Sequence, residues 1–367
     1  MSEKKFVHFG CWNNLNTGKN EKMLGNMKNV MTALSKHPKP DFLVIAGDNY
    51  YPEKVKPVLK EPKKKYIYKN RLIEGFDTLP KNIEINMILG NHDLDTNGDD
   101  IKTLFVKAED GHEELESNCL IIKEEMKFDK LKLVLNEKKR IGNTLLIMID
   151  TSMYSDEADV KDFMPCYNIF LKENMDTKTL IRRQENFIEK CIQDNKTVEN
   201  IIIIGHHPII YIKVKESKSK ESKKETEKSP KVLNDIPAFI NVLKMIKRTA
   251  DKNTQFHYLC ADLHLFQKGV VTIDKGHSSE MIVNQYIVGT GGTELDEGIL
   301  DQHLNKDYHI DSVSYHVSEC KKAFGFLECI IKETGPEFHF YNLKNSKQSK
   351  SNGGSKRRRT RKKILKN

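Results

Sequence analysis

The chain has 367 residues, enough for one large domain or two ordinary ones, and a formal net charge of +9 at pH 7. Its seven cysteines are an odd number with no CxxC pair, which argues against a disulfide framework or a structural zinc ribbon. The N-terminus lacks the features of a signal peptide, and no run of about 18 apolar residues occurs. We therefore expect a soluble, intracellular protein of a reducing compartment, the cytoplasm or nucleus.

The excess positive charge lies in a C-terminal tail. Residues 344–367 contain 11 Lys or Arg and no Asp or Glu, whereas the preceding 343 residues carry 50 basic and 52 acidic side chains. A polar spacer followed by a basic cluster is typical of disorder. The tail could bind nucleic acid, an anionic membrane or an import receptor, or it could only add solubility. It has no aromatic residue for stacking on bases, so we expect no sequence-specific readout.

We expect residues 1–343 to form one domain with a charged, disordered insertion at about 213–231. Short apolar runs predict strands at residues 6–9, 42–46, 83–89, 144–150, 201–204, 256–260, 281–288 and 324–331. Apolar residues at helical spacing predict helices at residues 21–36, 66–76, 177–195 and 237–250. An irregular region with hairpins is expected between residues 90 and 144. Buried strands that alternate with helices predict an α/β fold.

Five of the predicted strands end at a small residue that is followed at once by a group able to bind metal. These pairs are Gly10-Cys11, Gly47-Asp48, Gly90-Asn91, Gly205-His206 and Ala261-Asp262. Ligands in open α/β sheets lie beyond the carboxyl ends of the strands, so groups that are distant in sequence can meet there. A carboxylate such as Asp48 can bridge two cations because it has two oxygens. Taken alone, Asp48 would more often cap the next segment, but five such strand ends favour a metal site.

Three blocks carry a resemblance to a known family: residues 47–51 (GDNYY), 90–93 (GNHD) and 205–208 (GHHP). Weaker matches are residues 150–151, the glycine-rich loop at 289–292 and residues 324–326. The chain resembles the calcineurin-like metallophosphoesterases, and within them the purple acid phosphatases, over about residues 6–343. The resemblance implies a four-layer α/β/β/α sandwich with two central mixed β-sheets. It also implies a dinuclear site for Fe, Zn or Mn at the edge of the sheets.

The resemblance implies roles for single residues at this site. Asp48 would bridge the two metal ions. Tyr51 and His264 would bind the first ion, and Asn91 and His206 would bind the second.

Next to these residues, His92 would donate a hydrogen bond to the substrate phosphate or the leaving oxygen, so that Asp48 and His92 are the expected catalytic residues. For His92 the alternative is a structural hydrogen bond, and for His207 that interpretation is preferred.

Two ligand positions depart from the family pattern. Cys11 stands where the family has an aspartate, and Asp262 stands where it has the first histidine of GHxH. Both side chains can bind metal, and a thiolate favours zinc or iron. The carboxylate of Asp262 adds negative charge, which weakens the metal ions as Lewis acids and repels an anionic substrate. Activity could therefore be reduced, altered in metal preference, or lost.

The leading hypothesis is a metal-dependent, acid-phosphatase-like phosphomonoesterase. One alternative is an inactive binding protein that its basic tail tethers to nucleic acid or another anionic partner. Another is a phosphodiesterase or nucleotide hydrolase, because the loops that contact substrate vary most in such folds.

Overall fold

The computed structural model describes residues 3–13, 20–49, 51, 74–94, 105–107, 113–115, 131–214, 230–299 and 301–343. The strands of the first sheet are β1 (Lys4–Phe9), β2 (Phe42–Ala46), β3 (Glu84–Ile88), β6 (Leu131–Val134), β17 (Gly325–Lys332) and β18 (Gly335–Asn342). Those of the second are β7 (Asn136–Ile141), β8 (Thr144–Ile149), β9 (Asn200–Ile204), β12 (Gln255–Cys260), β13 (Phe266–Ile273), β14 (Met281–Val288), β15 (Lys306–Ile310) and β16 (Val313–Lys321). Small pairs form between β4 (Phe105–Lys107) and β5 (Glu113–Leu115), and between β10 (Tyr211–Val214) and β11 (Pro230–Leu233).

Both large sheets are mixed. The first has the order β18-β17-β1-β2-β3-β6, and β1, β2, β3 and β6 run parallel. The second has the order β15-β16-β13-β14-β12-β9-β8-β7, with β14, β12, β9 and β8 parallel. Parallel strands bring their carboxyl ends to one edge of each sheet, and this edge carries the candidate site.

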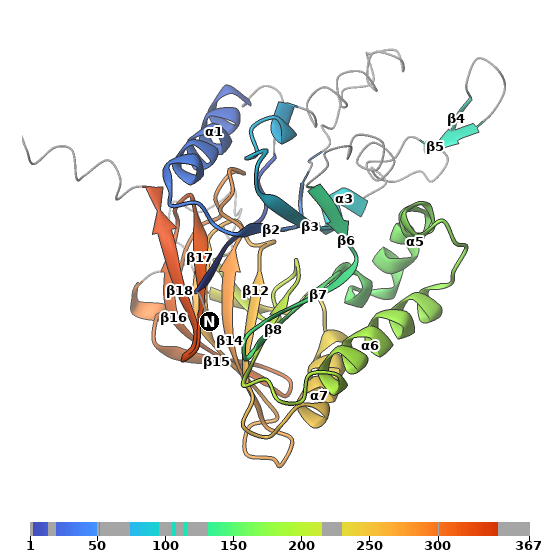
Figure 1. Ribbon diagram of the computed structural model, residues 1–367, viewed down its shortest axis with the longest axis vertical. Coiled ribbons are helices and arrows are strands. Elements are labelled where there is room, and N and C mark those ends of the chain that lie inside the picture. The colour runs from blue at the N-terminus through green and yellow to red at the C-terminus, as the bar shows by residue number, and fades with distance from the viewer. Residues whose placement is uncertain are drawn as a thin grey trace, which may run out of the picture.

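Helices cover the outer face of each sheet (Figure 1). They are α1 (Asn20–Lys36), α5 (Glu157–Leu171), α6 (Thr177–Gln193) and α7 (Phe239–Thr249), with the short α3 (Asn91–Leu94) and the 3-10 turns η2 (Ser152–Tyr154) and η3 (Asp301–His303). Helix α1 packs Met27, Val30 and Leu34 into the core of the first sheet. Helices α6 and α7 lie on the second sheet (Figure 1). The four-layer α/β/β/α sandwich is therefore confirmed.

The apolar runs follow this layering. In β8, Leu146 and Met148 belong to the core between the two sheets, whereas Leu145 and Ile147 pack under the helices. A strand with apolar cover on both faces needs no polar alternation, which is why continuous apolar runs predicted these strands correctly.

The predicted strands and three of the four predicted helices are present with small shifts at their ends. The fourth, at residues 66–76, lies mostly outside the described residues, of which 74–76 are helical. The prediction of disorder at 213–231 is wrong for the two ends of this segment, because they pair with each other as part of β10 and β11. Its centre and the tail at 344–367 lie outside the described residues.

Two further features concern the cysteines and the helices. Cys166 is disulfide-bonded, which the odd number of cysteines did not predict. Among the described helices, none is long and apolar enough to cross a membrane.

Candidate metal centre

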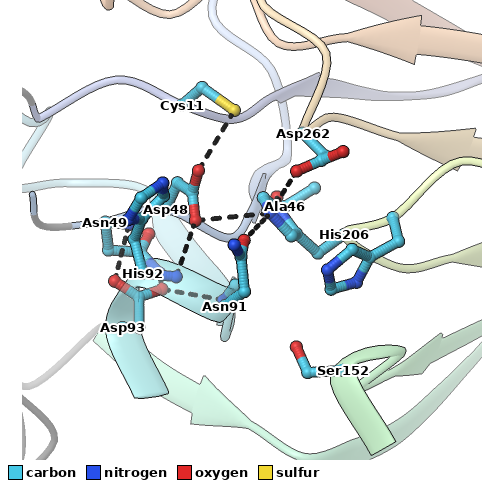
Figure 2. A network of polar contacts seen from close by, with 12 residues as sticks. Cys11, Ala46, Asp48, Asn49, Asn91, His92, Asp93, Ser152, His206 and Asp262 are labelled. Carbon is cyan, nitrogen blue, oxygen red and sulfur yellow. Dashed lines mark hydrogen bonds and ion pairs between the residues drawn. The ribbon is translucent and has the colours of Figure 1, made fainter. Parts of the chain in front are cut away.

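The five strand ends meet at one place (Figure 2). The Sγ atom of Cys11 lies 3.7 Å from Asp48 Oδ2, and His206 Nε2 lies 3.3 Å from Asp48 Oδ1. The same nitrogen is 3.1 Å from Asn91 Oδ1 and 3.6 Å from Asp262 Oδ1. The sequence therefore predicted the convergence of these side chains correctly.

Three of the strand ends share an unusual backbone conformation. Cys11, Asp48 and Asp262 have φ angles of 52°, 53° and 58°, in the left-handed region. Such a conformation costs a non-glycine residue about 1–2 kcal/mol and occurs mainly where the surrounding structure enforces it, as at functional sites. It turns each side chain out of its strand toward the shared space.

The small residues before the ligand positions are needed because the site is crowded. Gly47 has a φ of 79°, and a Cβ atom there would lie 2.4 Å from His206 Nδ1. A Cβ atom on Gly90 would lie 2.4 Å from Asp48 Oδ1 and 2.5 Å from the Asp48 nitrogen. A larger residue at either position would displace a side chain of the site.

The two carboxylate oxygens of Asp48 face different partners. Oδ2 accepts a hydrogen bond from the Tyr51 hydroxyl at 2.7 Å and from the Cys11 thiol. Oδ1 lies beside His206 Nε2 and accepts a hydrogen bond from the His92 backbone at 3.3 Å. Asp48 thus stands between two groups of potential ligands, which is the arrangement that a bridging carboxylate requires.

One ring nitrogen of His206 faces oxygen atoms alone. Its Nδ1–H donates to the Ala46 carbonyl at 2.7 Å, so the neutral ring has its lone pair on Nε2. That lone pair meets oxygens of Asn91, Asp48 and Asp262, all of which are acceptors. Only a proton or a metal ion between these atoms satisfies them, so the donor set fits a cation.

The second group, around Tyr51, has the same character. His264 Nδ1–H donates to the Glu294 carbonyl at 3.1 Å, and its Nε2 lies 3.2 Å from the Tyr51 hydroxyl oxygen. Because the Tyr51 proton is directed to Asp48, the lone pairs of His264 and Tyr51 face each other. A cation here would bind both.

The pKa values report the same concentration of negative charge. Burial opposes the charged form of His206, but Asp48 and Asp262 raise its pKa to about 10. Burial also opposes the charged carboxylates, yet His206 holds the pKa of Asp48 and of Asp262 below its ordinary value. Burial and the neighbouring carboxylates raise the pKa of the Cys11 thiol, and burial and Asp48 raise that of Tyr51. Without a metal ion, the thiol and the phenol stay protonated.

The two remaining histidines of the motifs have different surroundings. The His92 ring lies against the Tyr51 ring, with centroids 4.7 Å apart, at the edge of the site. The His207 ring is buried, its Nδ1 lies 3.2 Å from the Thr151 hydroxyl, and burial lowers its pKa to about 4. These contacts agree with a structural hydrogen bond for His207.

Sequence reasoning assigned no role to the residues that brace the site. Asp93 accepts hydrogen bonds from the backbone and side-chain amides of Asn49 at 2.8 and 2.7 Å and from Gly90 N–H at 2.8 Å. Burial, followed by the charge of Asp48, raises the Asp93 pKa to about 7. Thr293 binds the Cys11 carbonyl through its amide and its hydroxyl. Asn49 and Asp93 lie within the GDNYY and GNHD blocks, and this position in the motifs is the sequence feature that could have indicated their role.

Two groups of three possible ligand atoms occur among the described residues, each within 4.8 Å of one another. One is Cys11, Asp48 and His206; the other is His206, His207 and Asp262. Both contain His206, at the centre of the arrangement in Figure 2.

Comparisons with known proteins agree with this fold. Residues 4–236 match the family model for calcineurin-like phosphoesterases. The fold is similar to that of PhoD, with a TM-score of 0.57 and 12% identity over 93% of this chain and 69% of that chain. A further similar structure is GAP50, the anchor in the inner membrane complex of Plasmodium, with a TM-score of 0.48 and 14% identity over 94% of this chain and 86% of that chain. No curated protein sequence matches the chain. The family match spans more than half of the sequence, and the chain belongs to the calcineurin-like phosphoesterase family.

Proposed function

We propose that this chain hydrolyses a phosphomonoester at a dinuclear metal centre, in the manner of an acid phosphatase. The observation that carries the proposal is the division of the two Asp48 oxygens between two groups of potential metal ligands, Cys11 and Tyr51 at Oδ2 and His206 at Oδ1. On the Oδ1 side, oxygen atoms of Asn91, Asp48 and Asp262 all face His206 Nε2, an arrangement that a cation would satisfy.

The ligands would divide between the two ions. Asp48 would contact both. Cys11, Tyr51 and His264 lie on the side of its Oδ2, and Asn91, His206 and Asp262 lie on the side of its Oδ1. When bound, two metal ions lower the pKa of an attacking water and neutralise charge on the phosphoryl group.

The protein's own residues orient this chemistry. Thr293 and the left-handed turn at Cys11 hold the thiol toward Asp48. His92 would donate a hydrogen bond to a phosphate oxygen or to the leaving oxygen, supporting the negative charge that develops there. The Cys11 thiol favours zinc or iron over the harder manganese.

The proposal is tested by metal analysis of the purified protein and by hydrolysis of an aryl phosphate across pH with added zinc, iron or manganese. An Asp48→Asn variant should lose activity by more than the roughly 10–100-fold typical for loss of an outer-shell partner. An Asp251→Asn variant, at an exposed loop, is the matched control. If the wild type and Asp48→Asn hydrolyse at equal rates with every metal, the proposal is wrong. Preference for a bis-aryl phosphate would instead identify a phosphodiesterase.

A second candidate function follows from the state of Cys11. Burial and the nearby carboxylates keep its thiol protonated, so one ligand position is uncharged unless a metal ion displaces the proton. A protein with a weakened centre could act as a binding module that the basic tail tethers to an anionic partner. Its test is binding of duplex nucleic acid by the full chain and by a chain without residues 344–367. Equal binding at moderate salt would contradict an electrostatic tether.

A further inference from the structure

A single hydroxyl joins the ends of β8 and β9 behind the candidate centre. Thr151 Oγ1 accepts hydrogen bonds from the backbone N–H of His206 at 3.0 Å and of His207 at 2.9 Å. It also lies 3.2 Å from the Nδ1 atom of His207. Thr151 is fully buried. A Cβ atom on Gly205 would lie 2.4 Å from Thr151 Cγ2, so the two chain segments are in close contact.

Counting protons at this hydroxyl fixes the tautomer of His207. A threonine hydroxyl has one hydrogen to donate and two lone pairs to accept with. The two backbone N–H groups occupy both lone pairs, so the hydroxyl hydrogen is directed to His207 Nδ1. Nδ1 is then an acceptor, and the neutral ring carries its proton on Nε2. Neither nitrogen of His207 has a lone pair left for a metal ion.

The adjacent histidine is held through the opposite kind of bond. His206 Nδ1–H donates to the Ala46 carbonyl, so Nε2, which faces Asn91 and the carboxylates, is the nitrogen that can exchange its proton for a metal ion. Two neighbouring imidazoles therefore differ in what they offer a metal ion. The cause is the second partner of each ring, a hydroxyl donor for His207 and a carbonyl acceptor for His206.

We propose that Thr151 is a positioning residue that makes His206 the only metal ligand of the His206-His207 pair. The inference rests on the proposed metal centre and refines its ligand set. The group of His206, His207 and Asp262 is then a two-ligand arrangement, with His207 excluded. Thr151 acts twice, since its hydroxyl fixes the backbone that carries His206 and fixes the proton of His207.

The first test is the tautomer itself. Long-range proton–nitrogen NMR spectra of the metal-free protein at neutral pH, assigned with a His207→Gln variant, report which ring nitrogen carries the proton. We expect protonation of His207 at Nε2. Protonation at Nδ1 would overturn the proposal. This measurement needs no catalytic activity.

The second test uses zinc binding by the full chain. Thr151→Val keeps the shape of the side chain but removes the hydroxyl, and we expect zinc affinity to fall by about 10–100-fold, as for other outer-shell partners. Thr151→Ser keeps the hydroxyl and should restore binding. His207→Gln should keep the zinc stoichiometry of the wild type. Loss of one zinc ion in His207→Gln, or equal affinity in Thr151→Val and wild type, would refute the proposal.

A matched control separates positioning from general destabilisation. The Tyr258 hydroxyl donates to the His207 carbonyl at 2.6 Å, and Tyr258→Phe removes this bond from the same loop while the Thr151 hydroxyl and the His207 ring are both kept. We expect lower thermal stability with unchanged zinc affinity and tautomer. An affinity loss equal to that of Thr151→Val would show that both variants only loosen the loop. If the wild type binds zinc without turnover, hydrolysis is refuted and this inference stands. If it binds no zinc, the metal centre is refuted and with it the ligand choice.

Discussion

Replacing His257 by leucine should stabilise the protein in mild acid. His257 lies on β12, is 6% exposed, and neither of its ring nitrogens has a hydrogen-bond partner. Its ring packs against Phe338 of β18, with centroids 5.1 Å apart, in the space between the two sheets. Leucine has a similar volume and no polar atom to bury.

The expected size follows from the pKa. Burial lowers the pKa of His257 from 6.5 to about 4, because the charged ring has no partner in the folded protein. The unfolded chain takes up a proton on His257 near the ordinary pKa, whereas the folded protein does so only near pH 4. Protonation of this residue therefore does not lower the free energy of unfolding above pH 6.5. It lowers that free energy between pH 6.5 and about 4, and causes no further change below pH 4. The full loss is about 3 kcal/mol, at 1.36 kcal/mol per pH unit, and about 2 kcal/mol of it has occurred at pH 5.

Urea unfolding of wild type and His257→Leu near pH 7 and pH 5 measures the effect. The wild type should lose about 2 kcal/mol more than the variant between these pH values. Residual pH dependence is expected in the variant because burial also lowers the pKa of His8 to about 4. His309→Leu, at an exposed position of β15, should behave as the wild type does. Equal losses in wild type and His257→Leu would refute the reasoning. Protonation of these buried histidines would then limit the pH range in which the fold is stable.

Three further predictions concern the site and the tail. The double variant Cys11→Asp, Asp262→His restores the family pattern and should raise the rate of aryl phosphate hydrolysis by at least about 10-fold, because the metal ions become stronger Lewis acids. An unchanged rate would show that these positions do not limit activity. Gly90→Ala should lower the free energy of unfolding in urea by about 1–3 kcal/mol and weaken zinc binding, because its Cβ atom would overlap Asp48. As a control, Gly25→Ala in α1 should raise that free energy by about 0.5–1 kcal/mol, because nothing lies within 4 Å of its Cβ position. Deleting residues 344–367 should abolish salt-sensitive binding to duplex nucleic acid in a filter assay while leaving hydrolysis unchanged, and loss of hydrolysis would show a role for the tail in the site.

The sequence revealed the core and the order of the site, because both follow from local pattern. A continuous apolar run that stops at a small residue is enough to identify a buried parallel strand, and parallel strands bring their ends together. The strands β13, β15, β16 and β18 were not predicted, because polar, charged or glycine residues interrupt their apolar runs, although most residues of β13 are buried. Helix α5 was also missed, although Val160, Phe163 and Tyr167 are buried at helical spacing.

The bracing of the site could not be predicted in the same way. A hydroxyl such as that of Thr151, or a carboxylate such as that of Asp93, gains its role from partners on other strands. Those partners depend on register and on the distance between sheets, neither of which a single sequence specifies. The left-handed turns at the ligand positions are likewise imposed by neighbouring segments.

These left-handed turns also restrict which amino acids can replace the ligands in evolution. Aspartate, asparagine and histidine enter this backbone region several times more often than other residues with a side chain, and β-branched residues almost never do. At position 262 an exchange between histidine and aspartate therefore changes the charge of the centre with little backbone strain. Cys11 is the least suited of the three. The backbone thus allows the metal preference of the centre to drift through a small set of side chains while the fold stays the same.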